Sequence, residues 1–475
     1  MARPGALLPQ GGLLSSAAGE ELVALARLAT PIVGANLLQM AVYAIDVIFV
    51  ARLGTVEFAA ATLGVFLYSL TMWSLISMVA AASPIIAAER GRRAHAVREV
   101  RRTFRMSLWL GVAACVPFIL LLAHGETVLR FAGQNAVVAK RAGAFLDVLV
   151  FALVPGILAG AMRTAAAALG RPGWTLVVTA LAVGLGLLTN WLFVFGHGGF
   201  PAMGLEGSAL ASVVTVTAMM LAYGAILRFD RRLRRYRLFG RWWRPEWTRL
   251  REIFALGLPI ALAVTFEGGL FGGAALLMGL IGVDAVAAHA IAINIASITF
   301  QVPFGIAQAA TIRVGLAYGA ADHRAIGRAG AVALAAGVAT MMVMALLIWS
   351  FPRLFIAGYL DPRLPANAAV VAIAVQLLAV AALFQILDGA QAVGAGILRG
   401  LQDTRVPMLI ALFGYWVVGF GTAALLGFRF EMGAVGIWWG LAVGLAAVTA
   451  LFGWRWRSRA RLGLLPAARP LPRTT

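Results

Sequence analysis

The sequence is poor in the residues that soluble enzymes use for chemistry. Cys115 is its only cysteine, which excludes an intrachain disulfide and any cysteine metal cluster. The five histidines are scattered, with no pair at metal-ligand spacing, and no P-loop is present. Charged residues make up only 12% of the chain. We therefore expect no enzyme activity, no bound cofactor and no ATP-driven step within this chain.

Apolar residues are abundant instead. They make up 62% of 475 residues, far more than a soluble domain needs, which predicts an all-α polytopic membrane protein. Runs of roughly 20 apolar residues suffice to cross a bilayer. Twelve such segments are predicted, near residues 24–51, 59–88, 104–124, 142–163, 174–195, 207–228, 252–281, 286–316, 329–351, 367–397, 406–426 and 434–454.

The basic residues predict the orientation of these segments, because cytoplasmic loops of membrane proteins are enriched in Lys and Arg. With the N-terminus inside, 32 Lys or Arg fall on the cytoplasmic side and 7 on the outer side. Both termini are therefore predicted to be cytoplasmic. The expected division is an N-terminal arm (1–20), an N-lobe (21–228), a basic linker (229–251), a C-lobe (252–455) and a tail (456–475).

The linker is the most basic stretch, and it places Trp242, Trp243 and Trp247 beside arginines. This mixture is typical of a segment that lies at a membrane interface, where the stems and rings are apolar and the tips are wet. Because the net charge of +20 is spread over short runs between apolar segments, membrane lipids are the expected partner. A calmodulin-like target or a nucleic-acid patch is the alternative; we expect no nucleic acid.

The two halves of the chain repeat each other. Pro31 and Pro259 open similar segments, LATPIVGANLLQMA and LGLPIALAVTFEGG, 228 positions apart. The same offset relates Gly91 to Gly319. Six segments per repeat is an even number, so both repeats enter the membrane from the same side. The lobes should then be related by a pseudo-two-fold axis along the membrane normal, with the ligand site between them.

Glu267 is the most informative acid, because it lies near the middle of the predicted segment 252–281. No Lys or Arg occurs from Glu252 to Ile312, so no basic partner is expected beside it. A charge at mid-bilayer costs at least about 2.5–3.5 kcal/mol, which makes a buried acid a candidate functional residue. Four glycines follow within six residues and predict close approach of another backbone or a bend. The alternative is an acid tolerated at a helix–helix contact.

Asp388 is the second deep acid, about 16 Å from Arg399 at the end of its segment. Gln385 and Gln391 stand three residues to either side and share its helical face, which indicates the wall of a polar pathway. Neither Asp388's helix nor that of Glu267 supplies a Lys or Arg at mid-membrane depth.

Asp46 is the acid of the first predicted segment, about 9 Å from Arg52. An interfacial acid beside Arg52 is the simpler interpretation. Asn190 and Gln39, which the repeat places opposite Glu267, add polar groups to the N-lobe. Each could also serve only to bond a neighbouring helix.

The chain resembles the multidrug and toxin extrusion (MATE) family from end to end, its bacterial sodium-coupled branch most. The resemblance rests on LATPIVGANLLQMAVYAIDVIFVARLG, ALGRPGWTLVV, LLTNWLFVFG, MGLEGSALAS, LGLPIALAVTFEGG, GIAQAATIRVGLAYGA and FQILDGAQAVGAGILRGLQDT. It implies an active exporter of six plus six helices in a bacterial inner membrane.

The resemblance also implies roles for particular residues. Glu267 and Asp388 match the acidic pair that binds the coupling cation, with Na⁺ as the tentative metal ion. A role in substrate binding or proton coupling is assigned to Asp46, Asn190, Gln39, Gln385 and Gln391. Two positions depart from the family: Val194 replaces a second acid of the archaeal branch, and Phe384 replaces an expected tyrosine.

These observations predict a monomeric secondary antiporter that exports organic, cationic and amphipathic drugs in exchange for Na⁺ or H⁺. The lobes would rock between alternating states that the drug and the cation stabilise in turn. A lipid-linked precursor flippase is the first alternative, although basic residues rather than acids would then line the cavity. A passive channel is the second, and transport that fails to saturate would indicate it.

Overall fold

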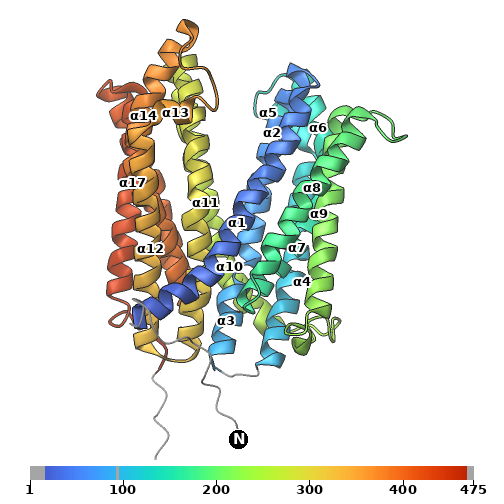
Figure 1. The fold of residues 1–475 in the computed structure, drawn as a ribbon, viewed down its shortest axis with the longest axis vertical. Coiled ribbons are helices and arrows are strands. Elements are labelled where there is room, and N and C mark those ends of the chain that lie inside the picture. The colour runs from blue at the N-terminus through green and yellow to red at the C-terminus, as the bar shows by residue number, and fades with distance from the viewer. Residues whose placement is uncertain (1–16, 93–95, 468–475) are drawn as a thin grey trace, which may run out of the picture.

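The computed structural model describes residues 17–92 and 96–467, and every regular element in them is helical. Twelve helical stretches in these ranges are long and apolar enough to cross a membrane, which confirms the predicted all-α architecture. Parts of the predicted arm (1–20) and tail (456–475) lie outside the described residues. We call the end of the bundle where α1 begins and α17 ends the basic end; it is at the bottom of Figure 1.

The first six spans are α1 (Ala17–Ala51), α2 (Thr55–Val79) with α3 (Ala82–Arg92), α4 (Val97–Ala123), α6 (Ala136–Leu149) with η1 (Val150–Ala152) and α7 (Leu153–Ala168), α8 (Gly173–Phe195) and α9 (Gly204–Phe229). The last six are α10 (Trp247–Ile281), α11 (Val283–Gly319), α12 (His323–Ser350), η3 (Pro365–Asn367) with α14 (Ala368–Gly400), the run α15 (Arg405–Leu412), η4 (Phe413–Phe420), α16 (Gly421–Ala424) and η5 (Leu425–Arg429), and α17 (Gly433–Arg457). Short helices outside the spans are α5 (Gly125–Phe131), η2 (Arg234–Tyr236) and α13 (Pro352–Ile356).

The spans form two lobes, each with its own hydrophobic core. The ribbons of the lobes lie together at the basic end and diverge toward the opposite end (Figure 1). Both repeats begin at the basic end, because each contains an even number of spans. The predicted relation by an axis along the membrane normal follows from this arrangement.

The first helix of each repeat is shared between the lobes. Leu25 and Ala29, early in α1, belong to the core of the C-lobe, whereas Ile32 and later residues of α1 belong to that of the N-lobe. In α10 the order is reversed, because Ile260 packs in the N-lobe core and Leu270 in the C-lobe core. Each helix changes lobe near its repeat-related proline, Pro31 or Pro259. The two lobes are therefore tied together by exchanged helix ends.

A symmetric backbone contact joins the lobes at the basic end. A Cβ added to Gly91 of α3 would overlap the carbonyl oxygen of Leu316 in α11, and one added to Gly319 would overlap that of Ala88. Ala88 and Leu316 are themselves separated by the repeat offset. The contact of Gly91 with Leu316 and the contact of Gly319 with Ala88 are therefore equivalent under the repeat, as a two-fold axis requires. Close backbone approach of this kind is the reason for glycine at both positions.

Ion pairs surround this contact. Arg313 of α11 donates to both carboxylate oxygens of the buried Glu21 in α1, over 2.7 and 2.6 Å. Arg249 of α10 reaches Glu99 of α4 over 2.8 Å and Glu89 of α3 over 3.6 Å. All these pairs connect one repeat to the other. The basic end is therefore where the lobes are fastened in this conformation.

The basic linker is anchored to the N-lobe by its apolar residues. Leu233, Tyr236 and Leu238 are buried in that core, while Trp243 is 74% exposed. Asp230 opens the linker and accepts hydrogen bonds from Trp174 over 2.9 Å and Arg171 over 2.6 Å. Burial favours the protonated form of Asp230, but these hydrogen bonds outweigh it and lower its pKa to about 2.

Candidate functional site

The Asp46 carboxylate of α1 is held by donors from two other helices of the N-lobe. Asn190 of α8 donates its amide to Oδ1 over 2.7 Å, and Ser212 of α9 donates its hydroxyl to Oδ2 over 2.7 Å. Asp46 makes no ion pair with Arg52 in the described part of the chain. The Asp46 carboxylate is therefore bound inside the N-lobe rather than to Arg52, and Asn190, which was assigned to the same function, is one of its two donors.

Ser212 was missed by the sequence analysis, although it ends the motif MGLEGSALAS. Nothing about a serine in an apolar helix distinguishes a carboxylate donor from a hydroxyl that bonds its own backbone. Val194 is 1% exposed, and its apolar side chain offers no oxygen that could bind a cation. Gln39 lies two turns before Asp46 on α1, and within the described ranges no hydrogen bond of its side chain is found. The structure does not bring Gln39 into the Asp46 network.

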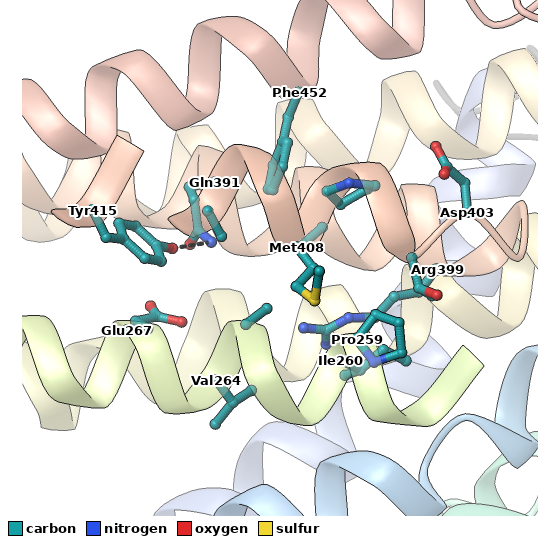
Figure 2. A pocket seen from close by; sticks show the side chains of 15 residues that line it. Pro259, Ile260, Val264, Glu267, Gln391, Arg399, Asp403, Met408, Tyr415 and Phe452 are labelled. Atoms are coloured by element: carbon teal, nitrogen blue, oxygen red, sulfur yellow. Dashed lines mark hydrogen bonds between the residues drawn. The ribbon is translucent and has the colours of Figure 1, made fainter. Parts of the chain in front are cut away.

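Glu267 lines a small cavity inside the C-lobe, between α10, α14 and the run that contains α15 and η4 (Figure 2). Tyr415 and Gln391 line it too, and the Gln391 amide donates to the Tyr415 hydroxyl over 2.7 Å. The Oε1 atom of Gln391 is buried without a hydrogen-bond partner. The cavity volume is about 30 Å³. It can hold a water or a small cation, whereas pockets for drug-sized molecules are about 300–1,000 Å³.

The local sequence explains how Tyr415 comes to face Glu267. The segment Phe413–Phe420 is π-helical, a widened turn that recurs at functional sites. Glycines at 419 and 444 let this segment pack closely against α17, since a Cβ on Gly444 would lie 2.6 Å from the Cα of Gly419. On the other side Trp416 donates to the carbonyl of Phe266, next to Glu267, over 3.2 Å. These contacts fix η4 against α10.

Two of the four glycines after Glu267 lie against side chains of η4. A Cβ on Gly269 would lie 2.9 Å from the Trp416 ring, and one on Gly273 would lie 2.9 Å from the Phe420 ring. They make room for aromatic side chains of η4, not for a neighbouring backbone. Pro259 is the residue inside α10 that interrupts its hydrogen bonding.

Asp388 and Gln385 are buried in the C-lobe outside this cavity. Asp388 is 6% exposed and its Oδ1 atom has no hydrogen-bond partner; both polar atoms of the Gln385 amide are likewise buried without one. Neither residue is among those that line the cavity, but Glu267 and Asp388 are within electrostatic range of each other. Of the three residues predicted to share a helical face, Gln391 therefore lines the cavity, whereas Gln385 and Asp388 do not.

Glu267 has a basic neighbour, contrary to the sequence-based expectation. Arg399, near the end of α14, lines the same cavity and extends its side chain along it toward Glu267 (Figure 2). The two are within electrostatic range but form no ion pair within 4 Å. The sequence analysis overlooked Arg399 because it considered only bases on the same segment or at the same depth. An arginine side chain from a neighbouring helix can reach along the cavity from a shallower position.

Phe384, where a tyrosine was expected, is packed in an aromatic cluster. Phe384 is 1% exposed, and the centroid of its ring lies 5.4 Å from that of Trp438 and 6.2 Å from that of Phe271. Trp438 in turn donates to Nδ1 of His289 over 3.2 Å. No group of three or more His, Cys, Asp or Glu in the described residues has the geometry of a polydentate metal site. The C-lobe site consists instead of two carboxylates, a tyrosine hydroxyl, an amide and one guanidinium.

Comparison with known proteins gives the same picture. The MatE family model matches residues 31–192 and again residues 259–425, so that its two copies begin at Pro31 and Pro259. The chain is 47% identical to a probable multidrug resistance protein NorM of Mesorhizobium japonicum, over 93% of this chain and 95% of that one. It is also 47% identical to a protein of the same description from Brucella suis, over 92% and 93%.

Solved structures share the fold. The eukaryotic MATE transporter AtDTX14 has a TM-score of 0.83 at 20% identity, covering 94% of this chain and 99% of that one. A multidrug resistance MATE family transporter in an outward-facing conformation also has a TM-score of 0.83, at 19% identity, covering 93% and 96%. With its family model, relatives and fold in agreement, the chain belongs to the multidrug and toxin extrusion family and is a multidrug efflux transporter.

Proposed function

We propose that the protein exports organic cations in exchange for Na⁺ or H⁺, with Glu267 and Asp388 as the charged groups that hold the coupling cation. The main support is that two carboxylates inside the C-lobe lie within electrostatic range of each other: the half-buried Glu267, which lines a cavity of about 30 Å³, and the buried Asp388. Such a pair loses hydration and repels itself, so a cation or a shared proton stabilises it. The cavity is too small for a drug, which must bind elsewhere, between the lobes.

The N-lobe acid has a separate role in this proposal. Asp46 lies in the half of α1 away from the basic end, and its hydrogen-bonding groups come from α8 and α9. We assign it to contact with the substrate or with a proton. Asn190 would act with Asp46 through the hydrogen bond between them, and Gln39 would act separately, two turns earlier on α1. The descriptions of the relatives support multidrug export; a lipid-linked precursor flippase and a passive channel are not favoured.

The coupling experiment uses purified protein in proteoliposomes loaded with ethidium, with sodium and proton gradients imposed separately at zero membrane potential. Glu267→Gln and Asp388→Asn should each abolish gradient-driven movement, because an amide neither carries a charge nor releases a proton. If both variants retain coupled export, the site is misplaced. If only a proton gradient drives the wild type, Na⁺ is excluded as the coupling ion.

The surroundings of the protein also belong to this proposal. We place it in the inner membrane of a bacterium, as a monomer, with both termini and the basic linker in the cytoplasm. The exposed arginines and tryptophans of the linker would contact anionic lipid headgroups there.

A further inference from the structure

The cavity beside Glu267 contains a charge that the coupling proposal does not use. Arg399 and Asp403 both line it at the end nearer the basic end of the bundle. Asp403 is already neutralised, because Arg455 of α17 donates to both of its carboxylate oxygens, over 2.5 and 3.0 Å. Arg399 has no ion pair of its own among the described residues. One uncompensated guanidinium therefore shares a small cavity with one uncompensated carboxylate.

The position of Arg399 suits it to act on Glu267 from a distance. Its side chain lies between α10 and Met408 and is directed along the cavity toward Glu267 and Tyr415 (Figure 2). The space that separates the two charges is the one that could hold a water or a small cation. Charges in such surroundings are weakly screened, so the guanidinium and a bound cation would repel each other.

We propose that Arg399 is a tethered counter-ion of Glu267 that competes with the coupling cation for this carboxylate. While Arg399 is present, its charge lowers the affinity of the Glu267 site for the coupling cation. When the cation has left, the Arg399 guanidinium compensates the charge of Glu267. The transporter can then pass through its cation-free state without an uncompensated carboxylate inside the C-lobe. The inference rests on the proposed role of Glu267, and Arg399 acts in it as a positioning residue for the cation.

The test compares R399Q and R399M, which remove the charge, with R399K, which keeps it. Ethidium export from proteoliposomes is measured against sodium concentration at fixed pH, and against proton concentration in sodium-free choline buffer. Loss of the competing charge should lower the half-maximal concentration of the coupling cation about ten-fold. R399K should remain near the wild type. A residue that only supported the fold would lower the maximal rate and leave the half-maximal concentration unchanged.

The outcomes separate this inference from the proposal on which it rests. If E267Q retains coupled export, the cation site itself is misplaced. If E267Q is uncoupled but R399Q and R399M keep the half-maximal concentration of the wild type, only the role of Arg399 is refuted. If both neutral variants aggregate on size exclusion while R399K does not, Arg399 is a structural residue and the inference is overturned as well.

Discussion

Replacing Gly319 by alanine should loosen the contact between the lobes at the basic end. The new Cβ would overlap the carbonyl oxygen of Ala88, and α3 and α11 would have to part by about 1 Å to bring it to 3.0 Å. The obstacle is backbone, so no side-chain rotation can relieve it. Nearby, a Cβ added to Gly315 would lie 3.0 Å from the Cβ of Ala87, so the helices are also closely packed there and would lose that packing as they separate.

The size of the effect follows from the cost of overpacking, about 1–3 kcal/mol. Because about 1.4 kcal/mol is a factor of ten, the population should shift roughly 5- to 150-fold toward conformations in which the lobes separate at this end. Alanine also favours the helix over glycine by about 1 kcal/mol. That gain is present in both conformations of a folded helix and cancels from the equilibrium between them.

Distances between spin labels on the two lobes would measure this shift. Arg98 in α4 and Arg324 in α12 are exposed at the basic end and can carry the labels after Cys115 is replaced. The matched control is Gly224→Ala in α9, where an added Cβ meets nothing within 4 Å. A Gly319→Ala protein that is well folded and has the distance distribution of the wild type would refute the reasoning.

Four other outcomes are expected. A C-terminal green fluorescent protein fusion should fluoresce and an alkaline phosphatase fusion should be inactive; the reverse would contradict the cytoplasmic termini. Arg313→Gln leaves the buried Glu21 carboxylate unpaired, at a cost of about 1–3 kcal/mol, and should also lengthen the spin-label distance. Asp46→Asn should impair export by at least about ten-fold at normal expression, whereas wild-type drug resistance would make Asp46 a structural acid. The pKa of Asp230 is lower folded than unfolded, so its stabilising effect should persist above about pH 4 and disappear toward pH 2 in thermal unfolding; Asp230→Asn should lack this dependence.

The spans could be predicted because a bilayer imposes length and hydropathy directly on the sequence. The predicted segment 59–88 lies within the observed Thr55–Arg92, and 142–163 lies within Ala136–Ala168. Hydropathy does not predict interruptions inside a span, such as the break between α2 and α3 or the π-helical turn at Phe413–Phe420. These depend on neighbouring helices, which re-satisfy the backbone at such places.

The repeat was also visible in the sequence, since the spacing of Pro31 and Pro259 survives in the chain. The exchange of the first halves of α1 and α10 between the lobes was not. The sequence of an apolar helix does not indicate in which of two apolar cores the helix packs. For the same reason Asp46 and Asn190 could be singled out only through a family resemblance, while Ser212 could not be distinguished from other serines.

The same limit bears on the cation site, where the substitution at Phe384 predicts a poorer set of oxygen ligands. Phe384 does contribute only packing, against Trp438 and Phe271. Yet a tyrosine hydroxyl lies in the Glu267 cavity all the same, because the π-helical turn directs Tyr415 into it and Gln391 holds its oxygen over 2.7 Å. An oxygen count made along α14 alone therefore underestimates the site. Arg399 likewise could not be predicted from the sequence of α10. The functional groups of this cavity come from three segments, α10, α14 and η4, which only the fold brings together.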